Sequence, residues 1–155
     1  MRVVLFEPKI PQNTGNIVRT CSVTGCGLIL VEPLGFSVTD RWLKRAGLDY
    51  WEGVEVEKIS NLEAFLQQTT SSFTFFSSHA TKLYTQEQYA EDHLLIFGSE
   101  DAGLPALYHE RWPERFVKLP MRPGARCLNL ATTVGIAVYH GLYGSVRNGE
   151  IKQEI

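Results

Sequence analysis

Three stretches of the sequence combine glycine with amide, carboxylate or guanidinium side chains where an apolar run gives way to a helix-like pattern. They are residues 13–19 (NTGNIVR), 94–105 (LLIFGSEDAGLP) and 117–130 (VKLPMRPGARCLNL). Glycine lets a ligand approach the backbone, and amide or carboxylate groups can orient a hydroxyl or stabilise a cation. Arginine stays protonated in proteins, so Arg19 is a permanent donor. These residue types favour chemistry that depends on orientation and charge stabilisation.

Each stretch also has a structural explanation. Asn13 and Asn129 suit helix caps, and Glu100 suits the positive end of a helix. The glycine spacing differs from the GxGxxG dinucleotide fingerprint, and no lysine follows Gly103 as in a phosphate-binding P-loop. Taken singly, the first and third stretches are better explained as caps, and the second leaves both explanations open. A joint site is favoured because all three lie at strand-to-helix junctions, where open α/β sheets bind ligands.

Composition limits the class of protein. The chain has 155 residues, of which 44% are hydrophobic, enough for one domain with a single core. Its formal net charge of −2 means that any contact with nucleic acid requires a local basic patch. Three cysteines without CxxC spacing and four separated histidines predict neither a disulfide framework nor a metal site. Without a signal-peptide pattern or a membrane-spanning run, we expect a soluble, cytoplasmic protein.

Strand and helix signals alternate along the chain. Apolar runs typical of strands cover residues 2–6, 28–31, 54–59, 73–76, 93–97 and 116–119. Helices are expected after caps at Asn13, residues 39–40 and the capping box 60–63, and over residues 104–109 and 129–143. This alternation predicts a single α/β domain over residues 1–155, with a mostly parallel sheet and helices on both faces.

In their order, the motifs NTGNIVR, FGSEDAGLP and LPM…CLNLA resemble the three motifs of the SPOUT methyltransferases. Residues 6–12 (FEPKIPQ), 31–36 (VEPLGF) and 44–50 (KRAGLDY) resemble the minimal tRNA wobble-nucleotide 2′-O-methyltransferases of the TrmL or YibK type. The resemblance covers nearly the whole chain. It implies a C-terminal trefoil knot, a homodimer and S-adenosylmethionine (SAM) bound in the knot loops, and periodicity alone predicts no knot.

The resemblance also implies the site residues. The expected SAM pocket is formed, largely through backbone groups, by Phe76, Gly98, Leu119, Met121, Cys127 and Leu128. The expected catalytic positions are Arg19, Glu100 and Asn129. We expect Arg19 to orient the ribose 2′-hydroxyl and its neighbouring phosphate and to stabilise developing negative charge. No metal is expected, because the cofactor carries the reactive group.

The RNA contacts are expected on basic and aromatic side chains. Helical spacing puts Arg41, Lys44 and Arg45 on one face, for which a solvated helix is the alternative. Tyr139 is a candidate for base stacking, and core packing is its alternative. Other residues expected near the pocket are Lys9, Arg122 and Arg126.

The expected function is SAM-dependent 2′-O-methylation of the ribose of the tRNA wobble nucleotide, cytidine or uridine 34. Two residues depart from the family pattern, since Cys127 replaces a usual serine and His140 a usual acidic residue. Two alternatives stay open. One is the same reaction on another RNA, and the other is a non-catalytic RNA-binding module that has lost turnover through these departures.

Overall fold

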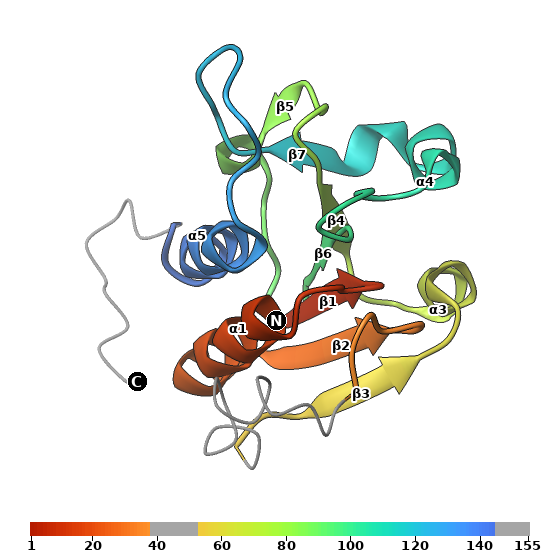
Figure 1. Cartoon of the computed structure of the whole chain (residues 1–155). Coiled ribbons are helices and arrows are strands. Elements are labelled where there is room, and N and C mark those ends of the chain that lie inside the picture. Colours follow the sequence, from red (N-terminus) through yellow and green to blue (C-terminus); the bar gives the residue numbers. More distant parts are fainter. Residues whose placement is uncertain (38–52, 145–155) are drawn as a thin grey trace.

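The computed structural model describes residues 1–37 and 53–144. Within these residues one seven-stranded sheet has the order β3-β2-β1-β6-β4-β7-β5, and all its strand pairs are parallel (Figure 1). The strands are β1 (Arg2–Phe6), β2 (Gly27–Val31), β3 (Val56–Ile59), β4 (Phe73–Phe76), β5 (Lys82–Leu83), β6 (Leu94–Phe97) and β7 (Phe116–Lys118). Because the strands run in one direction, their carboxyl ends meet at one edge.

The central strands are buried on both faces. The sequences of β2, β4 and β6 are nearly continuous apolar runs, GLILV, FTFF and LLIF. Adjacent side chains of a strand point to opposite faces, and Leu94, Leu95 and Ile96 are all fully buried. Such runs are typical of a parallel sheet covered on both sides, which is why they were recognisable in the sequence.

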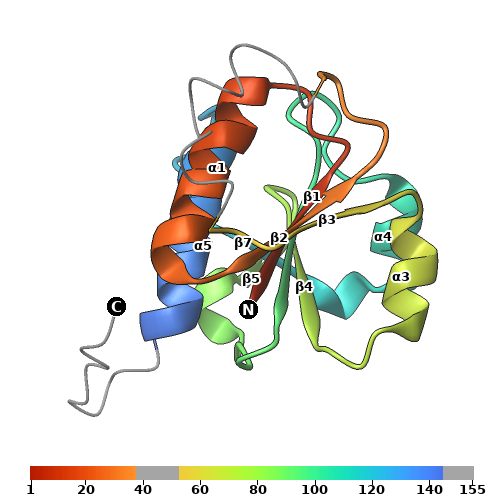
Figure 2. The same ribbon diagram turned by 90° about the horizontal axis from the view of Figure 1, so that it is seen from below.

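Helices cover both faces of the sheet. They are α1 (Pro11–Thr24), α3 (Leu62–Gln68), α4 (Ala106–Arg111) and α5 (Leu130–Tyr143), with the 3₁₀ turns η1 (Tyr84–Gln86) and η2 (Pro113–Arg115). Figure 2 shows α1 and α5 on one side and α3 and α4 on the other. The core is divided accordingly, with Ile17 and Val138 in one cluster and Leu66 and Tyr108 in the second. The predicted α/β fold with helices on both faces is confirmed.

The loops at the carboxyl edge come from strands that are neighbours in the sheet. β1 pairs with β6, β6 with β4, and β4 with β7. The loops that follow these four strands therefore lie next to one another. They cover residues 7–10, 77–81, 98–105 and 119–129. Two of them contain parts of the second and third motifs, and the first leads into α1, which contains the first motif.

Several predicted element boundaries were wrong. The strand expected over residues 54–59 is β3 (Val56–Ile59), and α4 begins and ends two residues later than expected. Asn61, rather than Ser60, caps α3, and its side chain accepts a hydrogen bond from the Ala64 N–H at 2.9 Å. The short elements β5, η1 and η2 were not predicted, because two or three residues carry no periodic pattern. The helix expected after residues 39–40 lies outside the described residues.

The start of α1 was also predicted wrongly. The helix begins at Pro11, whose fixed φ suits a first helical position, and Ile10 is its N-cap. Asn13 is therefore not a cap. It lies in the first turn, with only 5% of its surface exposed.

Candidate active site

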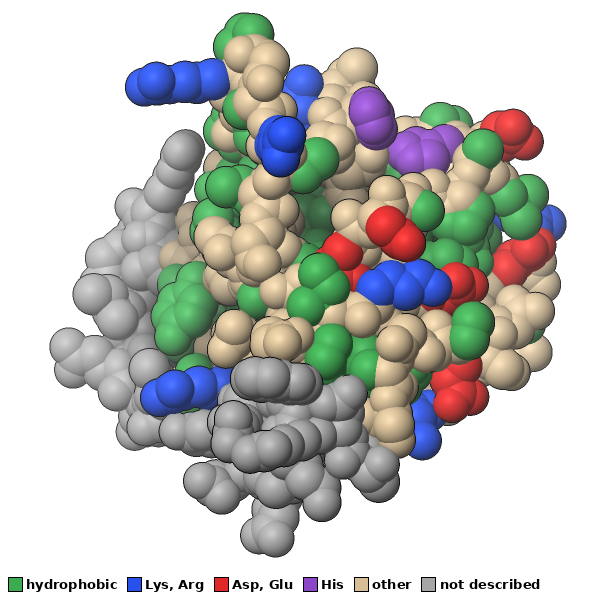
Figure 3. Space-filling view, in the orientation of Figure 1, with side chains coloured by type: hydrophobic (Ala, Val, Ile, Leu, Met, Phe, Trp, Pro, Cys, Tyr) green, Lys and Arg blue, Asp and Glu red, His purple; other side chains and the backbone are tan. Residues whose placement is uncertain are grey.

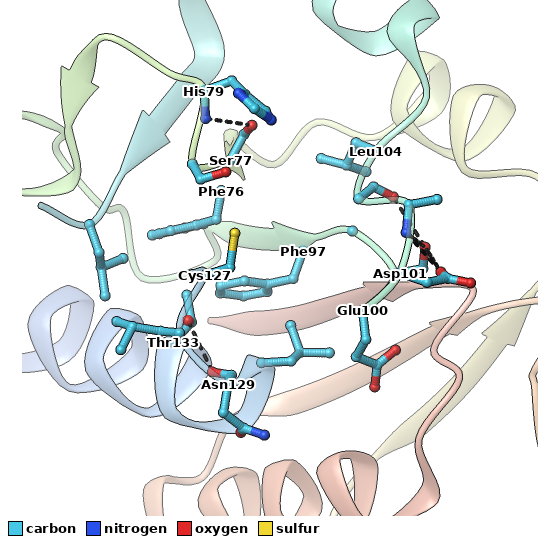
Figure 4. A pocket seen from close by; sticks show the side chains of 18 of the residues that line it. Phe76, Ser77, His79, Phe97, Glu100, Asp101, Leu104, Cys127, Asn129 and Thr133 are labelled. Carbon is cyan, nitrogen blue, oxygen red and sulfur yellow. Dashed lines mark hydrogen bonds between the residues drawn. The ribbon is translucent and has the colours of Figure 1, made fainter. Parts of the chain in front are cut away.

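A pocket of about 490 Å³ opens at the carboxyl edge of the sheet (Figure 4). Its walls are the loops after β4, β6 and β7, together with Ile10 and Asn13 at the start of α1. We call it the carboxyl-edge pocket. All three sequence motifs contribute to it, as their common position at strand ends predicted.

Most of the expected site residues line this pocket. They are Phe76, Gly98, Glu100, Leu119, Met121, Cys127, Leu128 and Asn129. Arg19 is exposed on α1 and is not among the lining residues, and Tyr139 is exposed on α5. The expected RNA-binding residues Arg41, Lys44 and Arg45 lie outside the described residues.

One wall of the pocket is flat and apolar. The rings of Phe76 and Phe97 stack with their centroids 4.6 Å apart, and Figure 4 shows Cys127 beside them. Met121 and Leu128 are 36% and 42% exposed, although both are apolar. Because Phe76 and Phe97 are themselves buried, the apolar surface that a ligand would cover is mainly that of Met121 and Leu128.

The loop after β6 is closed by its own hydrogen bonds. The Ser99 N–H donates to the Gly103 carbonyl at 3.0 Å, and the Gly103 N–H donates back at 2.9 Å. A Cβ on Gly98 would lie 2.6 Å from the Gly103 carbonyl oxygen, so a side chain there would force the loop open. Ser99 Oγ donates to Asp101 at 2.9 Å, and this hydrogen bond is the main cause that lowers the pKa of Asp101. Because a side chain at position 98 would clash with Gly103, glycine at this position allows the loop to close.

The Glu100 carboxylate accepts three N–H groups from the start of α1. The backbone N–H of Lys9 donates at 2.8 Å and that of Ile10 at 3.2 Å, while Asn13 Nδ2 donates at 3.0 Å. Glu100 therefore fixes the loop between β1 and α1. Its carboxylate is engaged by protein donors instead of standing free as a proton acceptor.

Asn129 is the N-cap of α5. Its Oδ1 accepts from the N–H groups of Ala131 at 2.9 Å and Thr132 at 3.3 Å. Its Nδ2 donates to Asn13 Oδ1 at 2.8 Å. The capping role considered from the sequence is thus present, and it is combined with a contact to the first motif.

Two features of the pocket were missed in the sequence. Asn13 lines it and hydrogen-bonds both Glu100 and Asn129, and only its place in the first motif pointed to it. At the opposite end, Ser77 and His79 line the pocket with His109, whose ring stacks on Phe116 at 3.8 Å. Figure 3 shows histidine side chains at the surface on the face of the molecule that is seen in Figure 1. Isolated histidines in separate segments gave no sequence signal for this end.

Basic side chains lie near the mouth of the pocket. Arg122 and Arg126 are exposed on the loop between β7 and α5 that forms one wall. Lys9 lies beside the loop held by Glu100, with its Nζ 3.7 Å from a Glu7 carboxylate oxygen. Arg122 and Arg126 supply local positive charge of the kind that binds a phosphate backbone, whereas Lys9 is paired with Glu7.

Comparison with known proteins decides the family. The model of the SpoU rRNA Methylase family matches residues 1–139. The chain belongs to this family. A tRNA (cytidine(34)-2′-O)-methyltransferase of Aeromonas hydrophila is 43% identical, over 88% of this chain and 89% of the relative. A protein of the same name from Saccharophagus degradans is 42% identical, over 88% and 90%.

Solved structures share the fold. One described as "Structural insights into the 2-OH methylation of C/U34 on tRNA" has a TM-score of 0.83 at 38% identity, covering 90% of this chain and 87% of the other. An AdoMet-bound rRNA methyltransferase from Sinorhizobium meliloti has a TM-score of 0.82 at 25% identity, covering 93% of this chain and 56% of the other. The resemblance stated from the three motifs is confirmed.

Residues 1–37 and 53–144 contain no group of three or more His, Cys, Asp or Glu side chains that could hold a metal ion. Nor is any helix in that part long and apolar enough to cross a bilayer.

Proposed function

We propose that this SpoU-family chain is a SAM-dependent methyltransferase that acts on the ribose 2′-hydroxyl of the tRNA wobble nucleotide, cytidine or uridine 34. The observation that carries the proposal is the convergence of all three motifs on one pocket. Relatives named for this reaction at 42–43% identity support the choice of substrate, and so does the structure described for C/U34 of tRNA.

The pocket fits SAM in shape and chemistry. The apolar wall with Met121 and Leu128 at its surface suits an adenine, and the backbone at Gly98, Leu119 and Leu128, which also line the pocket, is proposed to meet its polar edge. The hydroxyl of Ser77 and the imidazole of His79 at the other end suit a charged amino-acid portion. Cys127 fits if its contact is made by the backbone, because a thiol hydrogen-bonds weakly.

SAM would supply an activated methyl group, and the chain supplies alignment and charge stabilisation. Arg19 is the proposed donor to the 2′-hydroxyl and the adjacent phosphate, with the proton lost to phosphate or water. Glu100 and Asn129 hold the loops around the site through hydrogen bonds to protein groups. This division of roles calls for no metal.

For tRNA binding we propose a contribution from Arg122 and Arg126 beside the pocket, and from Arg41, Lys44 and Arg45 in the segment outside the described residues. Tyr139, 47% exposed on α5, is a candidate for stacking on a base or for an interface between two copies. A cytoplasmic location follows from the substrate.

Two further features belong to the proposal, a trefoil knot and a homodimer. The order of strands supports the knot, because β7 lies outside β4 while α5 returns to contact α1 and β6. Exposed apolar residues on the adjacent helices α1 and α5 support the dimer, namely Val23, Ile136 and Tyr139. Of the other apolar residues of α5, Val138 lies in the core and Leu142 packs against it.

Calorimetry with SAM, combined with methyl transfer to unmodified tRNA and nuclease mapping of the product, tests this function. We expect SAM binding and a methylated ribose at nucleotide 34. Methylation of a different nucleotide or RNA would assign another substrate to the same chemistry. RNA binding without any product would show a non-catalytic module.

A further inference from the structure

Asn13 stands at the centre of a chain of hydrogen bonds that joins all three motifs. Its Nδ2 donates to Glu100 Oε1 at 3.0 Å, and its Oδ1 accepts from Asn129 Nδ2 at 2.8 Å. The Glu100 carboxylate also holds the backbone of Lys9 and Ile10, and Asn129 caps α5. One buried amide therefore connects the loops after β1, β6 and β7.

The direction of every hydrogen bond between Glu100, Asn13 and Asn129 follows from which groups can donate and which can only accept. An ionised carboxylate only accepts, so Asn13 must turn its N–H toward Glu100 and its oxygen toward Asn129. Asn129 must then donate to Asn13, and its remaining oxygen faces backbone N–H groups of α5 that only donate. No amide can flip without breaking two hydrogen bonds. Every donor in this series of hydrogen bonds, from the Glu100 carboxylate to the first turn of α5, therefore faces an acceptor.

We propose that Asn13 is a positioning residue that sets the register of the three loops around the cofactor, an inference that rests on the proposed function. Asn13, Glu100 and Asn129 also line the carboxyl-edge pocket. Glu100 belongs to the loop that contains Gly98, and Asn129 follows Cys127 and Leu128. Because Asn13 is 5% exposed, water cannot readily replace its hydrogen bonds. Losing this link lets the walls of the pocket shift relative to one another.

The substitution Asn13→Asp tests the link with little change of shape. It puts a second carboxylate against Glu100, and the two like charges repel. We expect the dissociation constant for SAM to rise about tenfold or more, as measured by calorimetry, and KM for SAM to rise with it. KM for tRNA should change far less. A purely structural role would instead reduce the folded fraction, which lowers kcat and leaves KM for SAM unchanged.

The double variant Asn13→Asp/Glu100→Gln provides a rescue. The side-chain amide that Glu100→Gln introduces can donate to the new carboxylate, which still accepts from Asn129, so the connection returns with one link reversed. We expect most of the lost SAM affinity to return, although the N–H of Ile10 then loses its acceptor. Gln12→Glu is the matched control, because it makes the same chemical change at an exposed neighbouring position. It should leave SAM affinity within about twofold of wild type.

Amide hydrogen exchange without cofactor gives a second readout. Exchange at Lys9 should be faster in Asn13→Asp and slower again in the double variant, whereas Ile10, whose N–H has lost its acceptor there, should stay fast. An Asn13→Asp protein with wild-type SAM affinity and exchange would overturn the positioning role, as would a defect that Glu100→Gln does not relieve. Failure of the wild-type protein to bind SAM would overturn the proposed function itself, and is thereby distinguished from these results.

Discussion

Glu100 and Asn129 occupy expected catalytic positions, yet their side chains are hydrogen-bonded to the protein itself. Glu100 accepts from Lys9, Ile10 and Asn13, and Asn129 is shared between Asn13 and the first turn of α5. Groups engaged in this way hold geometry more readily than they exchange protons. Of the three expected catalytic residues, Arg19 is therefore the one that we expect to contact the substrate.

Replacing Arg19 should separate catalysis from cofactor binding. Arg19 is exposed on α1 and does not line the pocket, so Arg19→Ala should leave SAM affinity nearly unchanged. Methyl transfer should fall by about two orders of magnitude, on the order of 3 kcal/mol for losing a transition-state donor. Arg19→Lys should rescue only partly, because an ammonium cannot reproduce the guanidinium fork. Single-turnover rates beside calorimetric affinities check this, and a loss of rate that tracks a loss of SAM binding would contradict it.

Cys127 should contribute mainly backbone contacts to SAM. It is exposed in the wall of the pocket, beside Phe97 in Figure 4. Cys127→Ser should therefore change SAM affinity by less than about tenfold, or about 1.4 kcal/mol. Titration of both proteins with SAM in a calorimeter makes the comparison. A larger gain on introducing serine would mean that a hydroxyl is needed at this position.

The helices and strands that depend on a local sequence pattern were predicted, and the contacts that depend on residues far away in the sequence were missed. The strands buried on both faces were recognisable as continuous apolar runs, and their carboxyl ends located the site. Asn13 was taken for a cap because its partners, 87 and 116 residues away, leave no local signal. The short strand β5 was missed because two residues carry no periodic pattern, and the histidine end of the pocket because its residues come from separate segments.

His93 makes the packing of β4 against β6 sensitive to acid. Its ring, 2% exposed, bridges Ser72 Oγ at 2.7 Å and Thr74 Oγ1 at 2.8 Å. Burial lowers the pKa of His93 from 6.5 to about 4, with Arg115 and the N-terminal amine acting in the same direction and Glu87 and Asp92 against it. The unfolded chain therefore takes up this proton first as the pH falls. Stability from His93 is complete above pH 6.5 and is lost as the pH falls toward 4.

Urea unfolding of wild type and His93→Gln between neutral pH and pH 4 tests this account. The stability advantage of wild type should shrink by an amount on the order of 3 kcal/mol over that range, because glutamine does not titrate. His79→Gln, at an exposed histidine, is the control and should follow wild type. An advantage independent of pH would show that His93 is not held neutral in the folded protein.

The helices on the two sides of the sheet differ in the apolar side chains that they expose. The helices α1 and α5 contact each other and lie side by side in both ribbon views, and they expose Val23, Ile136 and Tyr139. On the other side, Leu107 of α4 is 48% exposed. The α5 sequence is apolar beyond what its buried face requires, since only Val134, Ala137 and Val138 are buried. A second copy of the chain is the proposed partner of this apolar face, because two-fold symmetric homodimers are the commonest oligomers.

Charge introduced on α5 should therefore break the proposed dimer. Ile136 is 37% exposed in one copy, so Ile136→Glu should fold normally but place a charge where an interface excludes water. Sedimentation velocity at micromolar concentration should show a dimer for wild type and a monomer for Ile136→Glu, with methyl transfer reduced in the monomer. Leu107→Glu is the matched control, because Leu107 is at least as exposed but lies on α4 across the sheet, and this variant should stay dimeric. A wild-type protein that is a stable and active monomer, or an Ile136→Glu variant that remains dimeric, would place the interface elsewhere or remove it.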